Sequence, residues 1–442
     1  MLPIFDLSTR DGRSGFDERL AKLRATVSAS SEAASATAEI VEDVRAGGDE
    51  AVVRYMRQFT DPQFDAERIR VTPETLAAAD EQLSDELREA LRAAIEHVRQ
   101  YQRHIRPSHH APINIAGAEL GLRYTPVESV GLCVPGGTAV LFSTLIMLAV
   151  PAQVAGVPSE RISVIHPPPT RKGDEDVGDI SPIVLATCRM LGIERVYRIG
   201  GAQGVAALAF GTDSVEPVQM IAGPGNVYVQ LAKAQVNGVC GTDNGFYGPS
   251  EIVTLADERA DPARVASDLV AQAEHDPGKC FLVTWSAAVM DAIQREVREQ
   301  LAHRQRWEAI ENALREDSAA VLVGSAEEAV EIANAIACEH VSLAVDDPDA
   351  LLPKLRSAGE VFLGDATPVA AGDYYAGPSH CLPTGTTARF TSGVSVHTFL
   401  KRTGVVAYRD GMPGAAIEHI ARLAEAEGLD GHAASVRMRA RD

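Results

Sequence analysis

The segment from Val130 to Gly137 reads VGLCVPGG, a short apolar run that ends in a proline-glycine turn. An apolar helix is predicted after it, from Leu141 to Val150. Three such units of strand, glycine turn and helix predict a parallel, doubly wound sheet whose turns meet at the carboxyl edge of the strands. The other two units are Arg195–Ile199 with the turn GGAQG at 200–204, and Val218–Ala222 with the turn GPGN at 223–226.

The carboxyl edge of such a sheet is where a nucleotide would bind. None of the three turns is a Gly-x-Gly-x-x-Gly motif or a P-loop, so each glycine could serve only to make a tight turn. Together the turns favour a ligand, because small residues let the backbone approach a pyrophosphate. The amides of Gln203 and Asn226 could bond ribose or nicotinamide groups.

A second α/β segment begins with the apolar run 252–255 and continues through 281–284. Between them, Asp261-Pro262 predicts the start of a helix that carries Gln272 on its apolar stripe. A polar side chain there must be satisfied by a hydrogen bond or a metal, and His275 follows on the same face. The pair is either half of a metal site, or a core glutamine beside a histidine at a helix C-terminus.

Further ionisable residues follow at a helix-to-strand junction and in a loop. Glu339-His340 comes after a helix predicted from Ser325 to Ala337. A carboxylate and an imidazole could share acid/base work if both face a cleft, although such a pair alone is usually at the surface. The glycine-rich loop at 364–380 contains Asp373 and His380, and its aromatic and proline content argues against a flexible spacer.

Composition narrows the class of protein. The 442 residues include 41 basic and 61 acidic ones, for a net charge of −20. This balance argues against nucleic acid or an anionic membrane as a partner and favours a small-molecule substrate. The length predicts two large domains with appendages. Six cysteines without a Cys-x-x-Cys pair indicate neither a disulfide framework nor a thiolate zinc site, and no apolar run spans a bilayer, so we expect a cytoplasmic protein.

Residues 15–105 predict helix after helix, broken at Gly47-Gly48. The histidines within this region or just after it are expected to face solvent and are given no role: they are His97, His104, His109 and His110.

Together these motifs resemble those of the histidinol dehydrogenase family, over nearly the whole chain. The matching segments, in order, are Pro135-Gly136-Gly137, Gly200-Gly201-Ala202-Gln203, Gly223-Pro224-Gly225-Asn226, Gly248-Pro249-Ser250-Glu251, Gln272-Ala273-Glu274-His275, Glu339-His340, Ala371-Gly372-Asp373-Tyr374, His380 with Leu382-Pro383-Thr384, and Glu427 to His432.

The resemblance implies an α/β fold of two Rossmann-like parallel-sheet domains, with a helical N-terminal extension and a small C-terminal tail domain. The extension would be residues 1–25. The first domain would be discontinuous, 26–131 plus 250–394, and would carry the Glu339-His340 pair. The second, on the NAD side, would be 132–249, and the tail, 395–442, would be exchanged between the subunits of a homodimer.

The family oxidises L-histidinol through L-histidinal to L-histidine, the last steps of histidine biosynthesis, in two NAD-dependent steps at one zinc site per subunit. By motif, the zinc ligands would be Gln272, His275, Asp373 and His432. Glu339 and His340 would be the catalytic acid/base pair. Substrate would also contact Ser250, His380 and Glu427, besides His340 and the zinc ligands, and NAD would contact Cys133, Gln203 and Asn226.

The implied roles suit these residue types. Two imidazoles, a carboxylate and an amide would leave zinc Lewis-acidic, able to hold the imidazole and amine of the substrate as a template. Alcohol oxidation needs a base for the hydroxyl proton, which suits His340. Aldehyde oxidation needs an activated water, which suits Glu339.

Departures from the family pattern keep other functions open. Cys133 stands where the family usually has a tyrosine facing the cofactor, the segment 244–248 is bulkier than the usual Met-x-Ala-Gly, and His397 replaces an arginine or aspartate. The pocket could therefore accept another small polar alcohol, such as a sulfonated diol. A non-catalytic zinc or nucleotide module would be expected to lose Glu339 or His340. A zinc hydrolase would leave the glycine turns unexplained and lacks a His-Glu-x-x-His motif.

Overall fold

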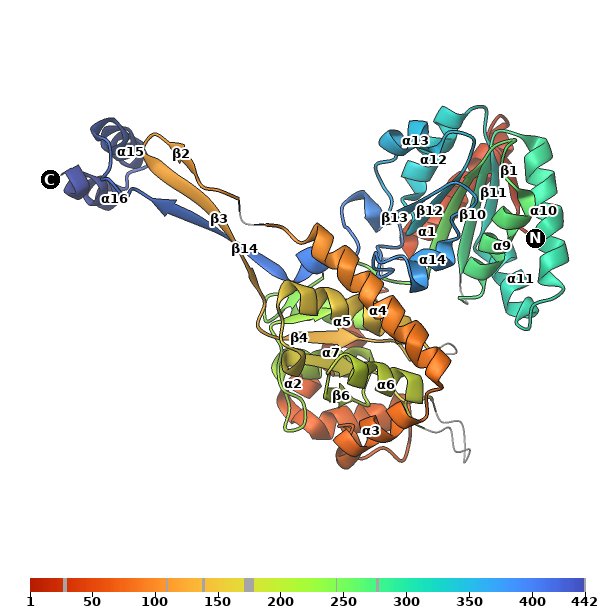
Figure 1. Ribbon diagram of the computed structural model, residues 1–442, viewed down its shortest axis with the longest axis horizontal. Helices are drawn as coiled ribbons and strands as arrows, with labels where there is room; N and C mark the ends of the chain where they lie inside the picture. Colours follow the sequence, from red (N-terminus) through yellow and green to blue (C-terminus); the bar gives the residue numbers. More distant parts are fainter. Residues whose placement is uncertain are drawn as a thin grey trace.

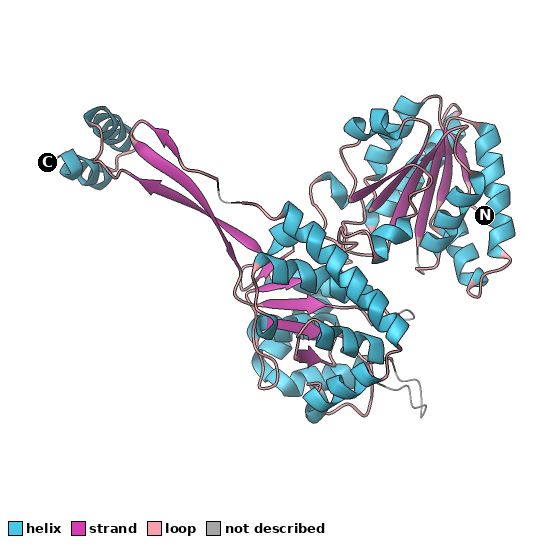
Figure 2. Ribbon diagram, in the orientation of Figure 1, coloured by secondary structure: helices cyan, strands magenta, loops and turns pink. Residues whose placement is uncertain are grey.

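Two parallel sheets and one antiparallel sheet organise the chain. The computed structural model describes residues 1–26, 30–108, 110–136, 140–170, 179–243, 245–275 and 278–440. Two α/β domains lie next to each other, and a long arm projects away from them (Figures 1 and 2). The predicted fold class, two parallel-sheet α/β domains with a small C-terminal part, is confirmed.

The first domain is built on a six-stranded sheet in which every neighbouring pair is parallel. Helices cover both faces, because its strands are buried runs with no polar face. In spatial order its strands are β1 (Ile4–Asp6), β11 (Ala319–Leu322), β10 (Lys279–Thr284), β9 (Glu251–Ala256), β12 (His340–Ala344) and β13 (Glu360–Leu363).

The helices of this domain divide between the two faces of the sheet. One apolar core joins the sheet to α9 (Pro262–Ala273), α10 (Ala287–Leu301) and α11 (Trp307–Glu316). The other joins it to α1 (Arg10–Ala25), α12 (Ala326–Ile336) and α13 (Pro348–Leu351). The short α14 (Val369–Tyr374) contacts α9.

The second domain has a five-stranded parallel sheet. Its strand order is β6 (Arg195–Tyr197), β5 (Ile162–Ile165), β4 (Val130–Cys133), β7 (Met220–Ala222) and β8 (Gly241–Thr242). One face is covered by α3 (Pro73–Glu81), α4 (Asp85–Ile105), α5 (Phe142–Ala155) and α6 (Pro182–Met190). The other is covered by α2 (Ser31–Phe59), α7 (Gly201–Phe210) and α8 (Val227–Val236).

The structure differs from the expected domain division at the N-terminal end. Residues 1–25 are not an extension, because β1 pairs with β11 and α1 packs on the first sheet. The predicted helices within 26–131 lie on the second sheet, not the first. Their apolar side chains, such as Val52 and Met56 of α2, share a core with α7 and α8. Gly48, with φ +54°, kinks α2 at the predicted break.

The arm is an antiparallel sheet of β14 (Leu400–Ala407), β3 (Ala118–Pro126) and β2 (Ile113–Ile115). The expected tail therefore shares its sheet with β2 and β3, which lie between α4 and β4 of the second domain in the sequence. Two helices, α15 (Gly414–Ala426) and α16 (Asp430–Arg437), pack together at the far tip around a small apolar cluster. Several large apolar side chains of the arm are exposed, including Val406 (68%), Leu423 (69%) and Met438 (66%).

Smaller elements complete the chain. The turns of 3-10 helix are η1 (Ala66–Arg68), η2 (Ser159–Arg161), η3 (Leu352–Lys354), η4 (Thr387–Arg389), η5 (Val396–Phe399) and η6 (Met438–Ala440). No helix in the described ranges is both long and apolar enough to cross a membrane.

Candidate active site

The candidate site lies where the amino edge of strands in the first sheet meets the carboxyl edge of strands in the second sheet. In the first sheet, β9 begins at Glu251 and β12 begins at His340, and Ile252 is paired with His340. Ser250 and Glu339 therefore lie side by side at the amino edge of these strands. A small pocket of about 110 Å³ lies here, and its lining includes Pro224 and Thr144 of the second domain as well as Ser250, Glu339 and other residues of the first. The pocket is thus shared between the two domains.

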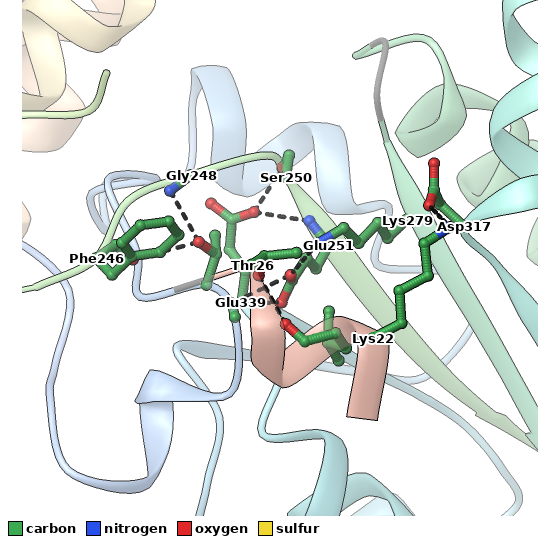
Figure 3. A network of polar contacts seen from close by, with 12 residues as sticks. Lys22, Thr26, Phe246, Gly248, Ser250, Glu251, Lys279, Asp317 and Glu339 are labelled. Carbon is green, nitrogen blue, oxygen red and sulfur yellow. Dashed lines mark hydrogen bonds and ion pairs between the residues drawn. The ribbon is translucent and has the colours of Figure 1, made fainter. Parts of the chain in front are cut away.

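Glu339 is anchored at one carboxylate oxygen (Figure 3). The Ser250 hydroxyl donates to Oε2 over 2.5 Å, and the Glu251 backbone N–H donates to the same oxygen over 2.9 Å. Glu339 is 6% exposed, and burial raises its pKa well above the usual range, opposed by these two hydrogen bonds. The other carboxylate oxygen takes part in neither of these hydrogen bonds, and the Glu339 side chain lines the pocket.

A buried ion pair supports the strand that begins beside Glu339. Lys279 Nζ lies 3.1 Å from Glu251 Oε1, and both side chains are almost completely buried. The Gly385 N–H donates to both oxygens of Glu251. The start of β9 is therefore tied both to β10 and to the loop that follows His380 (Figure 3).

His340 is fully buried and has both ring nitrogens free of hydrogen bonds. Nδ1 lies 3.9 Å from Glu339 Oε2, and Nε2 lies 3.7 Å from Asp373 Oδ1. Burial lowers the pKa of His340 to about 4, partly offset by the negative charge of Asp373. The imidazole is therefore neutral near pH 7 and able to accept a proton.

The segment at 364–380 brings Asp373 and His380 to the same pocket. Asp373 lies in α14. His380 Nδ1 is 2.7 Å from the Asp373 carbonyl oxygen, and its Nε2 is 3.2 Å from the hydroxyl of Thr144. The His380 ring therefore joins this loop to α5 of the second domain.

The residues predicted to hold zinc are only partly assembled in one chain. Asp373 and His275 both line the small pocket, and His275 is exposed at its mouth. Gln272 lies in α9, 3% exposed, and its Nε2 has no hydrogen-bond partner. Over the described ranges, no group of three or more His, Cys, Asp and Glu side chains is placed to hold a metal. An imidazole and a carboxylate at one pocket, with the amide of Gln272 three residues before the imidazole, fit a zinc site that needs a further ligand.

Glu427 and His432 lie far from this pocket in the same chain. Glu427 follows α15 and His432 is in α16, both exposed at the tip of the arm (Figure 1). The structure therefore brings Ser250, His275, Glu339, Asp373 and His380 together around the pocket, with His340 next to Glu339 and Asp373, and leaves Glu427 and His432 apart. Gln272 lies near the end of α9, three residues before His275.

A large cavity of about 830 Å³ opens at the carboxyl edge of the second sheet. Gly200, Gly201, Gln203 and Asn226 line it, from two of the three predicted turns; Gly136, from the third, lines it too, while Gly137 lies outside the described residues. Asn226 Oδ1 caps α8 by accepting from two backbone N–H groups, which leaves its amide nitrogen for a ligand. The volume and the glycine edge suit an elongated nucleotide.

Cys133 does not line this cavity in the described part of the chain. It ends β4, is 3% exposed and packs in a core of the second domain, where burial raises the pKa of its thiol to about 12. In the structure its side chain is a core residue, which separates it from the other two predicted NAD contacts.

Several residues of the two sites were missed in the sequence. The run Pro167-Pro168-Pro169-Thr170 and α2 side chains such as Phe59 line the large cavity, and Thr144 and Tyr374 line the small pocket. The strand before the prolines, β5, was also missed, because prolines follow it instead of a glycine turn. The signal that was available is the apolar run Ile162 to Ile165 directly before them.

A glycine-edged cavity on one parallel sheet and a buried glutamate-histidine pair on the facing sheet define a two-domain α/β oxidoreductase. The comparisons with known proteins give the family. The family model described as histidinol dehydrogenase matches residues 23–440, and the chain belongs to the histidinol dehydrogenase family.

Relatives agree with this assignment over most of their length. The chain is 43% identical to "Histidinol dehydrogenase 2" of Trichormus variabilis over 402 residues, 91% of each protein. It is also 43% identical to a histidinol dehydrogenase of Thermosynechococcus vestitus, covering 90% of this chain and 91% of that protein. The crystal structure of histidinol dehydrogenase from Elizabethkingia anophelis superposes with a TM-score of 0.85 at 31% identity, covering 95% and 96% of the two chains.

Proposed function

We propose that this protein catalyses the NAD-dependent oxidation of L-histidinol to L-histidinal and then to L-histidine, the last steps of histidine biosynthesis. The observation that carries the proposal is the pairing of His340 with Glu339, whose side chain lines a pocket shared by both domains. The large cavity next to it, edged by the turns that carry Gln203 and Asn226, is the proposed place for NAD.

His340 and Glu339 divide the acid/base work of the two steps. The neutral imidazole of His340 takes the hydroxyl proton of the alcohol as the hydride passes to NAD. Glu339, fixed by Ser250 and by the Glu251 N–H, directs its other oxygen to the water that hydrates the aldehyde. Its raised pKa suits a group that accepts a proton from that water. Ser250, Asp373 and His380 close the pocket around the substrate.

The residues that would hold zinc are Gln272, His275 and Asp373, with His432 of a second chain. Bound zinc would supply a Lewis-acidic template for the imidazole and amine of the substrate. The position of Gln272, buried at the end of α9 three residues before His275, supports this assignment. The fit is to a site completed by another chain, because His432 is at the tip of the arm.

A homodimer with exchanged arms follows from the same argument. The arm exposes large apolar side chains, including Val406, Leu423 and Met438, which favours docking on another surface. Docking on the body of a second chain would bring Glu427 and His432 to that chain's small pocket, and twofold symmetry would complete both sites.

One assay tests the reaction. Purified protein with zinc is given NAD and, separately, histidinol, histidinal or a sulfonated diol, and NADH formation is followed. We expect turnover with the first two compounds and formation of histidine from each. Turnover with the diol alone would replace the proposal with a related dehydrogenase, for which the buried Tyr247 beside the pocket would be the place to look for altered specificity.

A further inference from the structure

A second buried ion pair lies beneath the glycine turn that follows β7. Lys233 of α8 and Asp243, which follows β8, are 3% and 0% exposed at their side chains, and Lys233 Nζ lies 2.6 Å from Asp243 Oδ1. Both side chains also form a hydrogen bond with the backbone of Gly223. Lys233 donates to the Gly223 carbonyl oxygen over 2.9 Å, and the Gly223 N–H donates to Asp243 Oδ2 over 2.7 Å.

The clamped turn connects the two sites. Pro224 lines the small pocket and Asn226 lines the large cavity, so the residues directly after Gly223 form part of both walls. Lys233 Nζ also lies 5.1 Å from the ring centroid of Tyr247, another residue of the small pocket. A shift of the ion pair would therefore move walls of both sites together.

Stability of the fold does not by itself explain why this ion pair is buried here. A buried pair of charges loses its hydration, and packed apolar side chains of similar volume are often as stabilising. Here the pair fixes the orientation of the Gly223 backbone, because Lys233 binds the carbonyl oxygen of Gly223 and Asp243 binds its N–H. The Gly223 backbone also passes close to the end of β4, since a Cβ atom there would lie 2.4 Å from the Cys133 carbonyl oxygen.

We propose that Lys233 and Asp243 are positioning residues that hold the 223–226 turn between the coenzyme cavity and the acid/base pocket. In this way they would fix the position of bound NAD relative to the acid/base pair. The inference rests on the proposed function for the reaction, but its effect on coenzyme binding can be measured without any substrate.

The test is the double variant Lys233→Met/Asp243→Asn, which removes both charges and leaves neither one buried and unpaired. Three quantities are compared with wild type: the melting temperature, the dissociation constant for NAD, and kcat and KM with histidinol. The matched control is Arg195→Met/Glu216→Gln, which removes another ion pair of the same domain, 2.8 Å long and more exposed. The control should behave as wild type in all three.

We expect the double variant to fold, to bind NAD about tenfold more weakly and to lose about tenfold to a hundredfold in kcat. Its KM for histidinol should change less than kcat, because most of the proposed substrate contacts lie in the first domain and in the arm, and only the walls at Pro224 and Tyr247 would move. A primary deuterium isotope effect on kcat, measured with histidinol labelled at the carbinol carbon, should rise as hydride transfer becomes slower.

A folded double variant with wild-type NAD affinity and wild-type kcat overturns the inference. If the double variant does not fold, Lys233→Arg, which keeps the charge but moves the donor atoms, is measured in its place against the same two outcomes. Wild-type protein that binds NAD but does not oxidise histidinol refutes the proposed function instead. In that case the loss of NAD affinity alone decides the inference.

Discussion

Glu339 and His340 are consecutive in sequence but differ in how they are held. The carboxylate receives two hydrogen bonds, whereas the imidazole has none and is neutral near pH 7. The structure therefore fixes the residue that would direct a water and leaves the nitrogens of the other to accept the hydroxyl proton of the alcohol. The sequence showed that the two residues are adjacent. It did not show that they are buried beside a pocket, because that burial depends on Ser250, directly before β9, and on side chains of the second domain.

The division of labour predicts different losses in the two half-reactions. Glu339→Gln should slow histidinal oxidation by about a hundredfold or more, since only this step needs an activated water, and slow histidinol oxidation much less. The two rates are measured separately with each compound and NAD. Glu360→Gln is the control, because Glu360 lies opposite His340 on the neighbouring strand but lines a different cavity. Equal losses on both compounds would show that Glu339 only maintains the structure.

The zinc assignment makes a prediction for a single side chain. His275→Ala should abolish bound zinc and turnover without a loss of folding, because His275 is exposed at the mouth of the pocket and is no part of the apolar core. Metal content is measured by elemental analysis after dialysis, beside a thermal melt. His303→Ala, which changes a histidine after α10, should retain full zinc. Stoichiometric zinc in the His275 variant would refute the assignment of His275 as a zinc ligand.

At the scale of elements, the sequence predicted the glycine turns better than the helix ends. In the described residues each of the three predicted turns follows a strand of the second sheet, with Gly137 of the first turn outside them, because an apolar run, a glycine and a helix leave few other arrangements. The helix expected to end before Pro151 continues to Ala155, since a proline in a buried helix can be accommodated by the packing around it. The strand β5 was missed because no glycine turn follows it in the sequence.

The turn at Gly223 offers a test of why its glycine is required. Gly223 has φ +116°, and a Cβ atom would meet the Cys133 carbonyl oxygen at 2.4 Å. Gly223→Ala should destabilise the protein by about 3–5 kcal/mol, from backbone strain and a forced displacement. Gly238→Ala, at φ +108° with open space around it, should lose only about 1–2 kcal/mol from backbone strain. Chemical denaturation measures both, and equal losses would mean that the close contact is relieved at no cost.

At the scale of the whole molecule, the sequence could not assign the helices between Ser31 and Ile105 to a domain. Helical periodicity shows that a face is apolar but not which sheet it meets. The same limit applies to the arm: β3 lies between α4 and β4 of the second domain and β14 near the end of the chain, and their pairing joins segments far apart in the sequence. The motifs around Glu427 and His432 pointed to a site contribution that this chain does not make to its own pocket.

Exchange of the arms predicts that two inactive variants restore each other. His432→Ala damages the arm and His275→Ala damages the body. In a mixed dimer, one site receives both defects and the other receives neither. With random mixing about half of the dimers are mixed and each has one intact site, so roughly a quarter of wild-type activity should return after the two proteins are unfolded and refolded together.

The control distinguishes exchanged arms from simple stabilisation by a partner. A mixture of His432→Ala with Glu427→Ala places a damaged arm in every site, so it should stay inactive although mixed dimers form. Native mass spectrometry, with one variant isotopically labelled, counts the mixed dimers in both experiments. If the first mixture also stays inactive while mixed dimers are present, the arm must serve its own chain. It would then have to fold back across its own second domain, and β3 and β14 would have to bend away from the extended course they take here.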